Sequence, residues 1–171
     1  MRGINNGRSG LLDLCNNKNK NIHIIALQEH WLYDSNLYLM NSIHPEFVSL
    51  CISSMTERLH KTSVYYGRQY GGVGFLVRKS LYDRCKVSAR AVSGRCLSIK
   101  VTLYPGVDVN MVGVHFPCFS SSINYSNELS ECLSFLEDVL STGLPSVIVG
   151  DMNFSCDVNN EGFKQCNDVL S

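Results

Sequence analysis

Two carboxylates in this sequence each follow a short run of aliphatic residues. Glu29 comes just after the run Ile22–Leu27, and Asp151 comes just after Ser146–Val149, with Asn153 two residues further on. A carboxylate at the end of a buried strand is costly unless it accepts hydrogen bonds, pairs with a cation or binds a metal ion. If both strands point the same way in one sheet, the two carboxylates meet at one edge.

Such a meeting would suit divalent-metal chemistry. Two carboxylates, the amide oxygen of Asn153 and several waters are ligands that Mg²⁺ prefers. The ion would stabilise charge on a phosphoryl group and lower the pKa of a bound water. Asn153 could instead donate to a phosphate oxygen or orient the attacking water. The residues also allow a simpler interpretation, in which Asp151 caps a turn and Glu29 faces solvent.

The histidines and the basic residues are weaker candidates. His115, in the segment VGVHFPC, is either a half-buried packing residue or a catalytic group. His23 and His30 are weaker candidates for a catalytic role than His115. Arg78 and Lys79 close an apolar run and are most simply the solvated end of a strand.

The elements that must position these residues alternate between strands and helices. Leu97, Ile99, Val101 and Leu103 alternate with polar residues, and the turn YPGVD leads into a second strand, which predicts a hairpin. An apolar stripe at intervals of three and four residues predicts a helix over about 125–141. We expect further strands at 22–27, 46–53, 72–79 and 146–150, and a short helix with Ser9 as a possible N-cap. This order indicates one α/β layered domain with a mixed sheet, in which the strands at 22–27 and 146–150 are buried.

Composition narrows the classes of function. The 171 residues are 44% hydrophobic and carry fifteen basic and fifteen acidic side chains, so no overall cationic field points to nucleic acid or to a membrane surface. The start lacks the apolar core of a signal peptide, and no run reaches the length of a membrane span. We expect an intracellular, non-secreted protein of undetermined compartment, with its eight scattered cysteines reduced and structural.

Four segments together resemble the endonuclease/exonuclease/phosphatase superfamily. They are IIALQEHWL, GGVGFLVRKS, VNMVGVHFPC and VIVGDMN, in that order along the chain. The residues in these segments are most similar to those of the apurinic-type endonuclease domain of LINE-like, non-LTR retrotransposons. The segment RGINNGRSGLLDLC also resembles the stretch that follows the first strand in that group.

The resemblance implies a fold, a reaction and a set of roles. The fold is a DNase I-like four-layer α/β sandwich of two packed mixed sheets, and the reaction is phosphodiester hydrolysis with Mg²⁺ or Mn²⁺. Glu29 matches the metal-binding glutamate, and Asp151 matches the aspartate that orients or deprotonates the attacking water. Asn153 matches the asparagine that contacts the scissile phosphate. DNA would be the substrate, and a reverse transcriptase domain could follow in the full-length protein, with no membrane or small-molecule cofactor involved.

The departures from the family pattern produce further expectations. His115 stands where the family usually has a tyrosine, and Cys118 stands where the family often has an asparagine after the proline. The family's first strand, which ends in an asparagine just before the RG element, has no counterpart here, and neither do its later aspartate and its closing Ser-Asp-His motif. We therefore expect residues 1–171 to form a single, incomplete domain, truncated at both ends, with much of the second sheet missing and impaired activity. Two alternatives stay open: a catalytically inactive remnant or binding module, and a phosphatase or lipid phosphodiesterase of the same superfamily.

Overall fold

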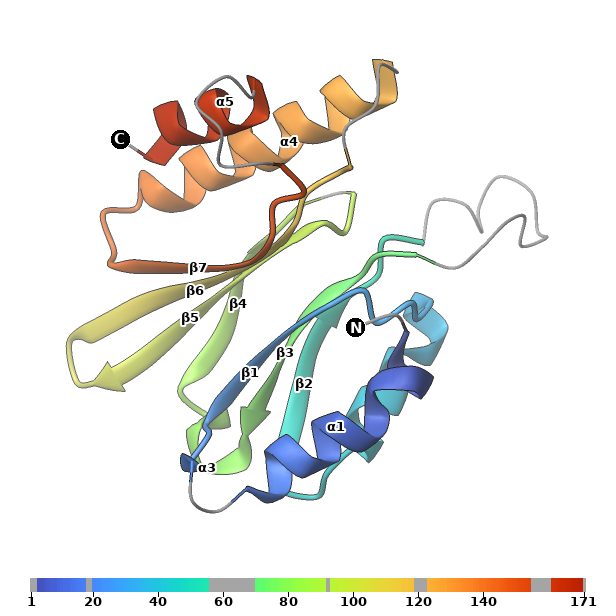
Figure 1. The fold of residues 1–171 in the computed structure, drawn as a ribbon. Coiled ribbons are helices and arrows are strands. Elements are labelled where there is room, and N and C mark those ends of the chain that lie inside the picture. Colours follow the sequence, from blue (N-terminus) through green and yellow to red (C-terminus); the bar gives the residue numbers. More distant parts are fainter. Residues whose placement is uncertain are drawn as a thin grey trace.

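The computed structural model describes residues 3–17, 20–55, 70–91, 93–118, 123–154 and 161–170. Their strands form two sheets that pack face to face (Figure 1). The first sheet has the order β1-β3-β2 and is antiparallel throughout. Its strands are β1 (Ile24–Gln28), β2 (Phe47–Ile52) and β3 (Val73–Arg78).

The second sheet has the order β4-β5-β6-β7 and is mixed. Its strands are β4 (Cys85–Arg90), β5 (Cys96–Tyr104), β6 (Val107–His115) and β7 (Ser146–Asp151). Pro105 and Gly106 join β5 to β6, and Gly106 takes φ +82°, a conformation that glycine adopts without strain. The predicted hairpin and the mixed sheet are therefore confirmed.

Helices cover the outer face of each sheet (Figure 1). The helix α1 (Ile4–Asn16) and the 3₁₀ helix η2 (Asp34–Ser42) lie on the three-stranded sheet, whereas α4 (Ile123–Leu140) and α5 (Glu161–Leu170) lie on the four-stranded one. A single turn, α3 (Lys79–Tyr82), follows β3. The layer order of helix, sheet, sheet and helix confirms the predicted DNase I-like α/β sandwich.

Three apolar clusters hold these layers together. Val73, Phe75, Leu97 and Ile99, all fully buried, fill the space between the two sheets. Leu11 and Cys15 of α1 pack with Met40, Phe47 and Leu76 against the first sheet. On the other side Cys132, Leu136 and Val139 of α4 meet Val112, Val114 and Phe116. The predicted apolar stripe of α4 is thus the face that seals the second sheet.

Several elements differ from the sequence prediction. The helix α1 begins at Ile4 after an N-cap at Gly3, so Ser9 lies inside it and is not its cap. The strands β1 and β7 are both edge strands and are only partly buried, with Val147 45% exposed. The prediction that they are buried was wrong, because apolar composition does not tell an edge strand from a central one.

Two further observations concern membranes and thiols. Within the described ranges, no helix has both the length and the apolarity needed to cross a membrane.

Seven of the eight cysteines lie in the described ranges and all seven are free thiols, whereas Cys156 lies outside the described residues. Cys96 and Cys132 are fully buried and fill the core as small apolar side chains.

Candidate active site

Glu29 lies one residue beyond the end of β1, in a backbone conformation that is unusual for its type. Its φ is +57°, a left-handed value that few residues other than glycine adopt. The Glu29 N–H donates to the carbonyl of Gly72 at 2.9 Å, and the Glu29 carbonyl accepts from Gly3 N–H at 3.0 Å. These two bonds fix the strained backbone and leave the Glu29 side chain 35% exposed. Strain of this kind concentrates at functional sites.

The neighbouring His30 is fully buried and anchors this turn. Its Nε2 donates to the carbonyl of Ile52 at 2.9 Å, and its Nδ1 accepts from Leu32 N–H at 3.1 Å, so the hydrogen-bond network assigns a neutral ring. Burial lowers the pKa of His30, and the Ile52 carbonyl only partly opposes that effect. Gly72 makes room for the ring, because a Cβ there would lie 2.3 Å from His30 Cε1.

His115 ends β6 and faces Glu29 across the two sheets. Its Nε2 lies 3.8 Å from Glu29 Oε1, and its side chain is 9% exposed. Within the β6–β7 ladder His115 is the register partner of Asp151. Burial and the Arg95 guanidinium lower the pKa of His115, while the carboxylates of Glu29 and Asp151 act to raise it. The His115 Nδ1 atom is buried and has no hydrogen-bond partner among the described residues.

Asp151 and Asn153 form a small turn at the end of β7. The Asp151 Oδ1 atom accepts from Asn153 N–H at 2.9 Å, and the Asp151 carbonyl accepts from Phe116 N–H at 2.8 Å. The Asn153 side-chain amide donates to the carbonyl of Phe116 at 2.7 Å. Asn153 takes φ +52°, which asparagine tolerates better than most residues. One amide N–H of Asn153 is therefore used to hold β6 and β7, while Asp151 remains exposed.

Arg95 is a residue of this region that the sequence did not single out. Its Nη1 donates to the His115 carbonyl at 3.3 Å, and its Nη2 pairs with Glu128 of α4 at 2.7 Å. The Arg95 carbonyl also accepts from His115 N–H at 2.8 Å. These contacts tie the end of β6 to α4. The only signal in the sequence was an arginine at the start of a predicted strand, which is too common to stand out.

His115 lies beside both predicted carboxylates, but these do not come from one sheet. Glu29 follows a strand of the first sheet and Asp151 ends a strand of the second, so the condition of a single shared sheet is not met. Because β1 packs against β6 and β7, the His115 ring reaches to within 3.8 Å of Glu29, while His115 is the register partner of Asp151. Arg78, expected to be a solvated strand end, is instead only 21% exposed, pairs with Glu46 at 2.6 Å and donates to the Ile22 carbonyl.

The sequence matches the Endonuclease/Exonuclease/phosphatase family over residues 1–159. The chain belongs to this family. A search of curated proteins finds no match to it. Solved structures of the same fold are similar at low identity, so for them the likeness shows the fold alone.

An AP endonuclease from Archaeoglobus fulgidus is 12% identical with a TM-score of 0.69, and the match covers 99% of this chain and 66% of the archaeal one. A 3′ phosphatase, NExo, from Neisseria, bound to product DNA hairpin, is 14% identical with a TM-score of 0.66 and coverages of 98% and 68%. The human Nocturnin catalytic domain is 13% identical with a TM-score of 0.54 and coverages of 92% and 60%. The chain thus spans about two thirds of the length of these structures.

Nucleases of this family generally use a divalent metal ion, for which Glu29, Asp151 and Asn153 are the candidate ligands. Among the described residues no three His, Cys, Asp or Glu side chains are grouped closely enough to hold an ion by themselves. The two partly exposed carboxylates of Glu29 and Asp151 are nonetheless the oxygen donors that a hard cation uses, and such a cation retains several waters. The residues fit a sparsely liganded, water-rich site and do not fit a closed cage.

Proposed function

We propose that this protein is a divalent-metal-dependent nuclease that hydrolyses phosphodiester bonds in DNA. The observation that carries the proposal is the position of His115, whose Nε2 lies 3.8 Å from Glu29 of the other sheet and whose register partner is Asp151. Membership of the Endonuclease/Exonuclease/phosphatase family supports the reaction class. The structures of similar fold include an AP endonuclease and a phosphatase bound to a DNA hairpin, which favours DNA as the substrate.

Glu29 and Asp151 are the residues that would hold the metal, for which we propose Mg²⁺ or Mn²⁺. When bound, such an ion supplies charge neutralisation at the phosphoryl group and lowers the pKa of a bound water. We propose that Asp151 also accepts a proton from, or orients, the attacking water. Asn153 keeps its carboxamide oxygen and one N–H for the metal or the phosphate, because its other N–H is bonded to Phe116.

His115 would act as a neutral hydrogen-bonding group near pH 7. Burial and Arg95 lower its pKa, so the ring does not carry a fixed positive charge there. It faces Glu29 through Nε2, which can hold the carboxylate in place or contact a phosphate oxygen. Arg95 serves the site indirectly, since it fixes the backbone of His115.

Two carboxylate variants test the proposal against a matched control. Glu29→Gln and Asp151→Asn remove one charge each from the site, whereas Glu137→Gln removes one from the exposed face of α4. We expect Mg²⁺- or Mn²⁺-dependent nicking of supercoiled plasmid to fall at least about 100-fold in the first two, the loss typical of removing one preorganised electrostatic group. The control should retain the parent rate and all three should keep the parent melting temperature. Equal rates in all four proteins would rule the proposal out.

The substrate subclass is a separate part of the proposal. The segments LQEHWL and GGVGFLVRK favour an endonuclease of the LINE-like retrotransposon type, which in a full-length protein would accompany a reverse transcriptase. Oligonucleotide duplexes with an internal abasic site, an intact backbone or a 3′-phosphate distinguish endonuclease action from the phosphatase action named for the Neisseria structure. Internal cleavage supports the endonuclease, and release of inorganic phosphate alone would replace it with the phosphatase.

A further inference from the structure

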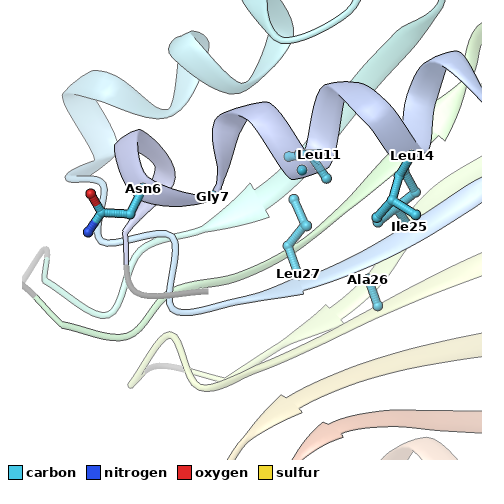
Figure 2. A pocket seen from close by; sticks show the side chains of 8 residues that line it. Asn6, Gly7, Leu11, Leu14, Ile25, Ala26 and Leu27 are labelled. Atoms are coloured by element: carbon cyan, nitrogen blue, oxygen red, sulfur yellow. The ribbon is translucent and has the colours of Figure 1, made fainter.

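Two hollows in the described part of the molecule differ in the chemistry of their walls. One lies between α1 and β1, has a volume of about 390 Å³, and is lined by residues without charge (Figure 2). The other has a volume of about 300 Å³ and is lined by Asp83, Arg84, Lys86, Lys100 and Thr102. Of the two, the second presents charges that an ion would recognise, and we call it the charged pocket.

The charged pocket lies on the outer face of the second sheet, where β4 runs beside β5. Cys85 and Ile99, on these two strands, belong to the apolar cluster between the sheets. Because successive side chains along a strand alternate between its two faces, Lys86 and Lys100 lie on the opposite, outer face. Lys86 is exposed and the Lys100 side chain is 40% exposed, so the pocket is open to solvent.

Three cationic side chains gather at this place on two neighbouring strands. Lys86 of β4 and Lys100 of β5 are register partners. Opposed residues of an antiparallel ladder have Cβ atoms about 4.5–5.5 Å apart, and like charges in such a pair repel each other. Arg84, two residues before Lys86, adds a third cation, and its carbonyl accepts from Thr102 N–H at 2.9 Å. An anion bound between these side chains would relieve their repulsion.

The protein itself neutralises only part of this charge. Asp108 of β6 accepts from Lys100 Nζ at 2.9 Å and, through its other oxygen, from the Thr102 hydroxyl at 2.6 Å. Lys86 has no ion-pair partner among the described residues. The second carboxylate at the pocket is that of Asp83. Three cations therefore face two carboxylates, which leaves an excess of one positive charge.

The three cations also keep hydrogen-bond donors that the protein does not use. Lys100 gives one N–H to Asp108, and Arg84 gives one to the Leu103 carbonyl at 2.9 Å. An ammonium group has three N–H donors and a guanidinium has five, so donors remain on all three side chains. Such a set suits the oxygens of a phosphate group. An excess of one charge matches a phosphodiester, which carries a single negative charge, better than a phosphomonoester, which carries nearly two.

We propose that the charged pocket binds a backbone phosphate of a DNA strand, away from the candidate active site. Naming the strand as DNA rests on the proposed function, whereas the binding itself needs no reaction. Asn110, the register partner of Lys100 on β6, lies five residues before His115, which is about 17 Å along an extended strand. The pocket therefore holds DNA several nucleotides from the bond that is cut. Tyr104, at the end of β5, is 71% exposed, so its ring is available to stack on a base.

Binding measured in EDTA separates the pocket from the metal-dependent reaction. Fluorescence anisotropy of a labelled DNA duplex gives the Kd of the parent and of two charge-reversed variants. Lys86→Glu should weaken binding at least about 10-fold and lower the slope of log K against log salt by about one, as for a lost phosphate contact. Lys164→Glu makes the same charge change on the exposed side of α5 and should keep the parent Kd and slope.

Both lysines are exposed, so both variants should keep the parent melting temperature. The proposal fails if the parent does not bind the duplex, if Lys86→Glu keeps the parent Kd, or if the two variants lose affinity equally. Competition identifies the occupant. Inorganic phosphate or polyglutamate that displaces the duplex at the same concentration of charged groups would assign the pocket to free phosphate or to an acidic protein, and would overturn the DNA site.

Plasmid nicking distinguishes a failure of the pocket from a failure of the proposed function. Lys86→Glu should raise the KM for DNA at least about 10-fold and leave kcat near the parent value, because the pocket contributes binding and no contact to the reacting atoms. If no protein nicks DNA but Lys86→Glu alone weakens binding, the pocket stands and the proposed function fails. If the parent nicks DNA and Lys86→Glu has the parent Kd and KM, the proposed function stands and the pocket fails.

Discussion

The two buried histidines of this protein occupy comparable places and perform different tasks. Both side chains are buried, since His30 as a residue is 0% exposed and His115 is 7% exposed. His30 follows Glu29 in the sequence, and His115 faces the Glu29 carboxylate in space. Burial lowers the pKa of both histidines. His30 uses both ring nitrogens in hydrogen bonds to the backbone. The Nδ1 atom of His115 has no hydrogen-bond partner in the part of the chain that the structure describes, and its Nε2 atom faces the Glu29 carboxylate.

The difference shows that burial alone does not tell whether a histidine has a structural or a functional role. A buried polar group with all its hydrogen bonds made stabilises one conformation, and nothing remains for it to do with a ligand. A buried group with an unused atom beside two carboxylates keeps capacity for a substrate, water or ion. By this criterion His30 holds the turn that presents Glu29, whereas His115 keeps an atom free for the role proposed for it.

The comparison of the two histidines predicts its largest effect on the stability of the protein, when His30 is replaced. His30→Ala removes two buried hydrogen bonds and leaves a cavity, so we expect a loss of about 3 kcal/mol in the free energy of unfolding. His23→Ala, at an exposed histidine of the loop before β1, should cost less than about 0.5 kcal/mol. Urea unfolding measures both. Similar losses for the two variants would remove the anchoring role assigned to His30.

The second effect is on activity. His115→Ala should reduce nicking of plasmid DNA about 100-fold, within the range expected for a group that acts on the reacting atoms. It should cost less than half the unfolding free energy lost by His30→Ala, because the His115 ring makes fewer hydrogen bonds. The measurement is the nicking rate of each variant, divided by the fraction of the protein that is folded. A His115→Ala protein of parent activity would place the two histidines in the same structural class.

The smallest effect is the pH dependence of stability. The folded-state pKa of His30 lies below the unfolded value of about 6.5, mainly because of burial, so the unfolded chain binds the proton more readily. The stability that this histidine provides is complete above about pH 6.5. It is lost as the pH falls from there toward the folded-state pKa, by up to about 1.4 kcal/mol per pH unit.

Urea unfolding at pH 7.5 and pH 5 measures that slope, and His30→Gln should make it shallower. His115 has a lowered pKa as well, but the Glu29 and Asp151 carboxylates oppose the shift, so His115→Gln should change the slope less. The reverse ranking would contradict the comparison.

Periodicity in the sequence was sufficient to predict the central elements. Leu97, Ile99 and Val101 alternate because β5 has neighbours on both sides and one face in the space between the sheets. The stripe of Leu129, Leu136 and Val139 predicted α4 because that helix covers a single face. Both patterns are local consequences of burial, and a sequence records burial well.

Elements shaped by contacts distant in sequence were less visible. The strand β4 carries Lys86 between two apolar residues and ends at Arg90, and α5 is short and rich in polar residues, so neither was predicted. The roles predicted for Glu29, Asp151, Asn153 and His115 stay predictions, and the sequence did not reveal that these residues come from two sheets. Nothing local reveals that Asn153 is bonded to Phe116, or that Arg95 fixes the backbone of His115.

Glu29 and Asp151 lie in opposite halves of the sequence, so they leave the ribosome far apart in time. The hairpin of β5 and β6 joins neighbours and closes early, whereas β7 reaches β6 only after α4 has been made and folded back. Asp151 is therefore the last of these residues to reach its place beside His115.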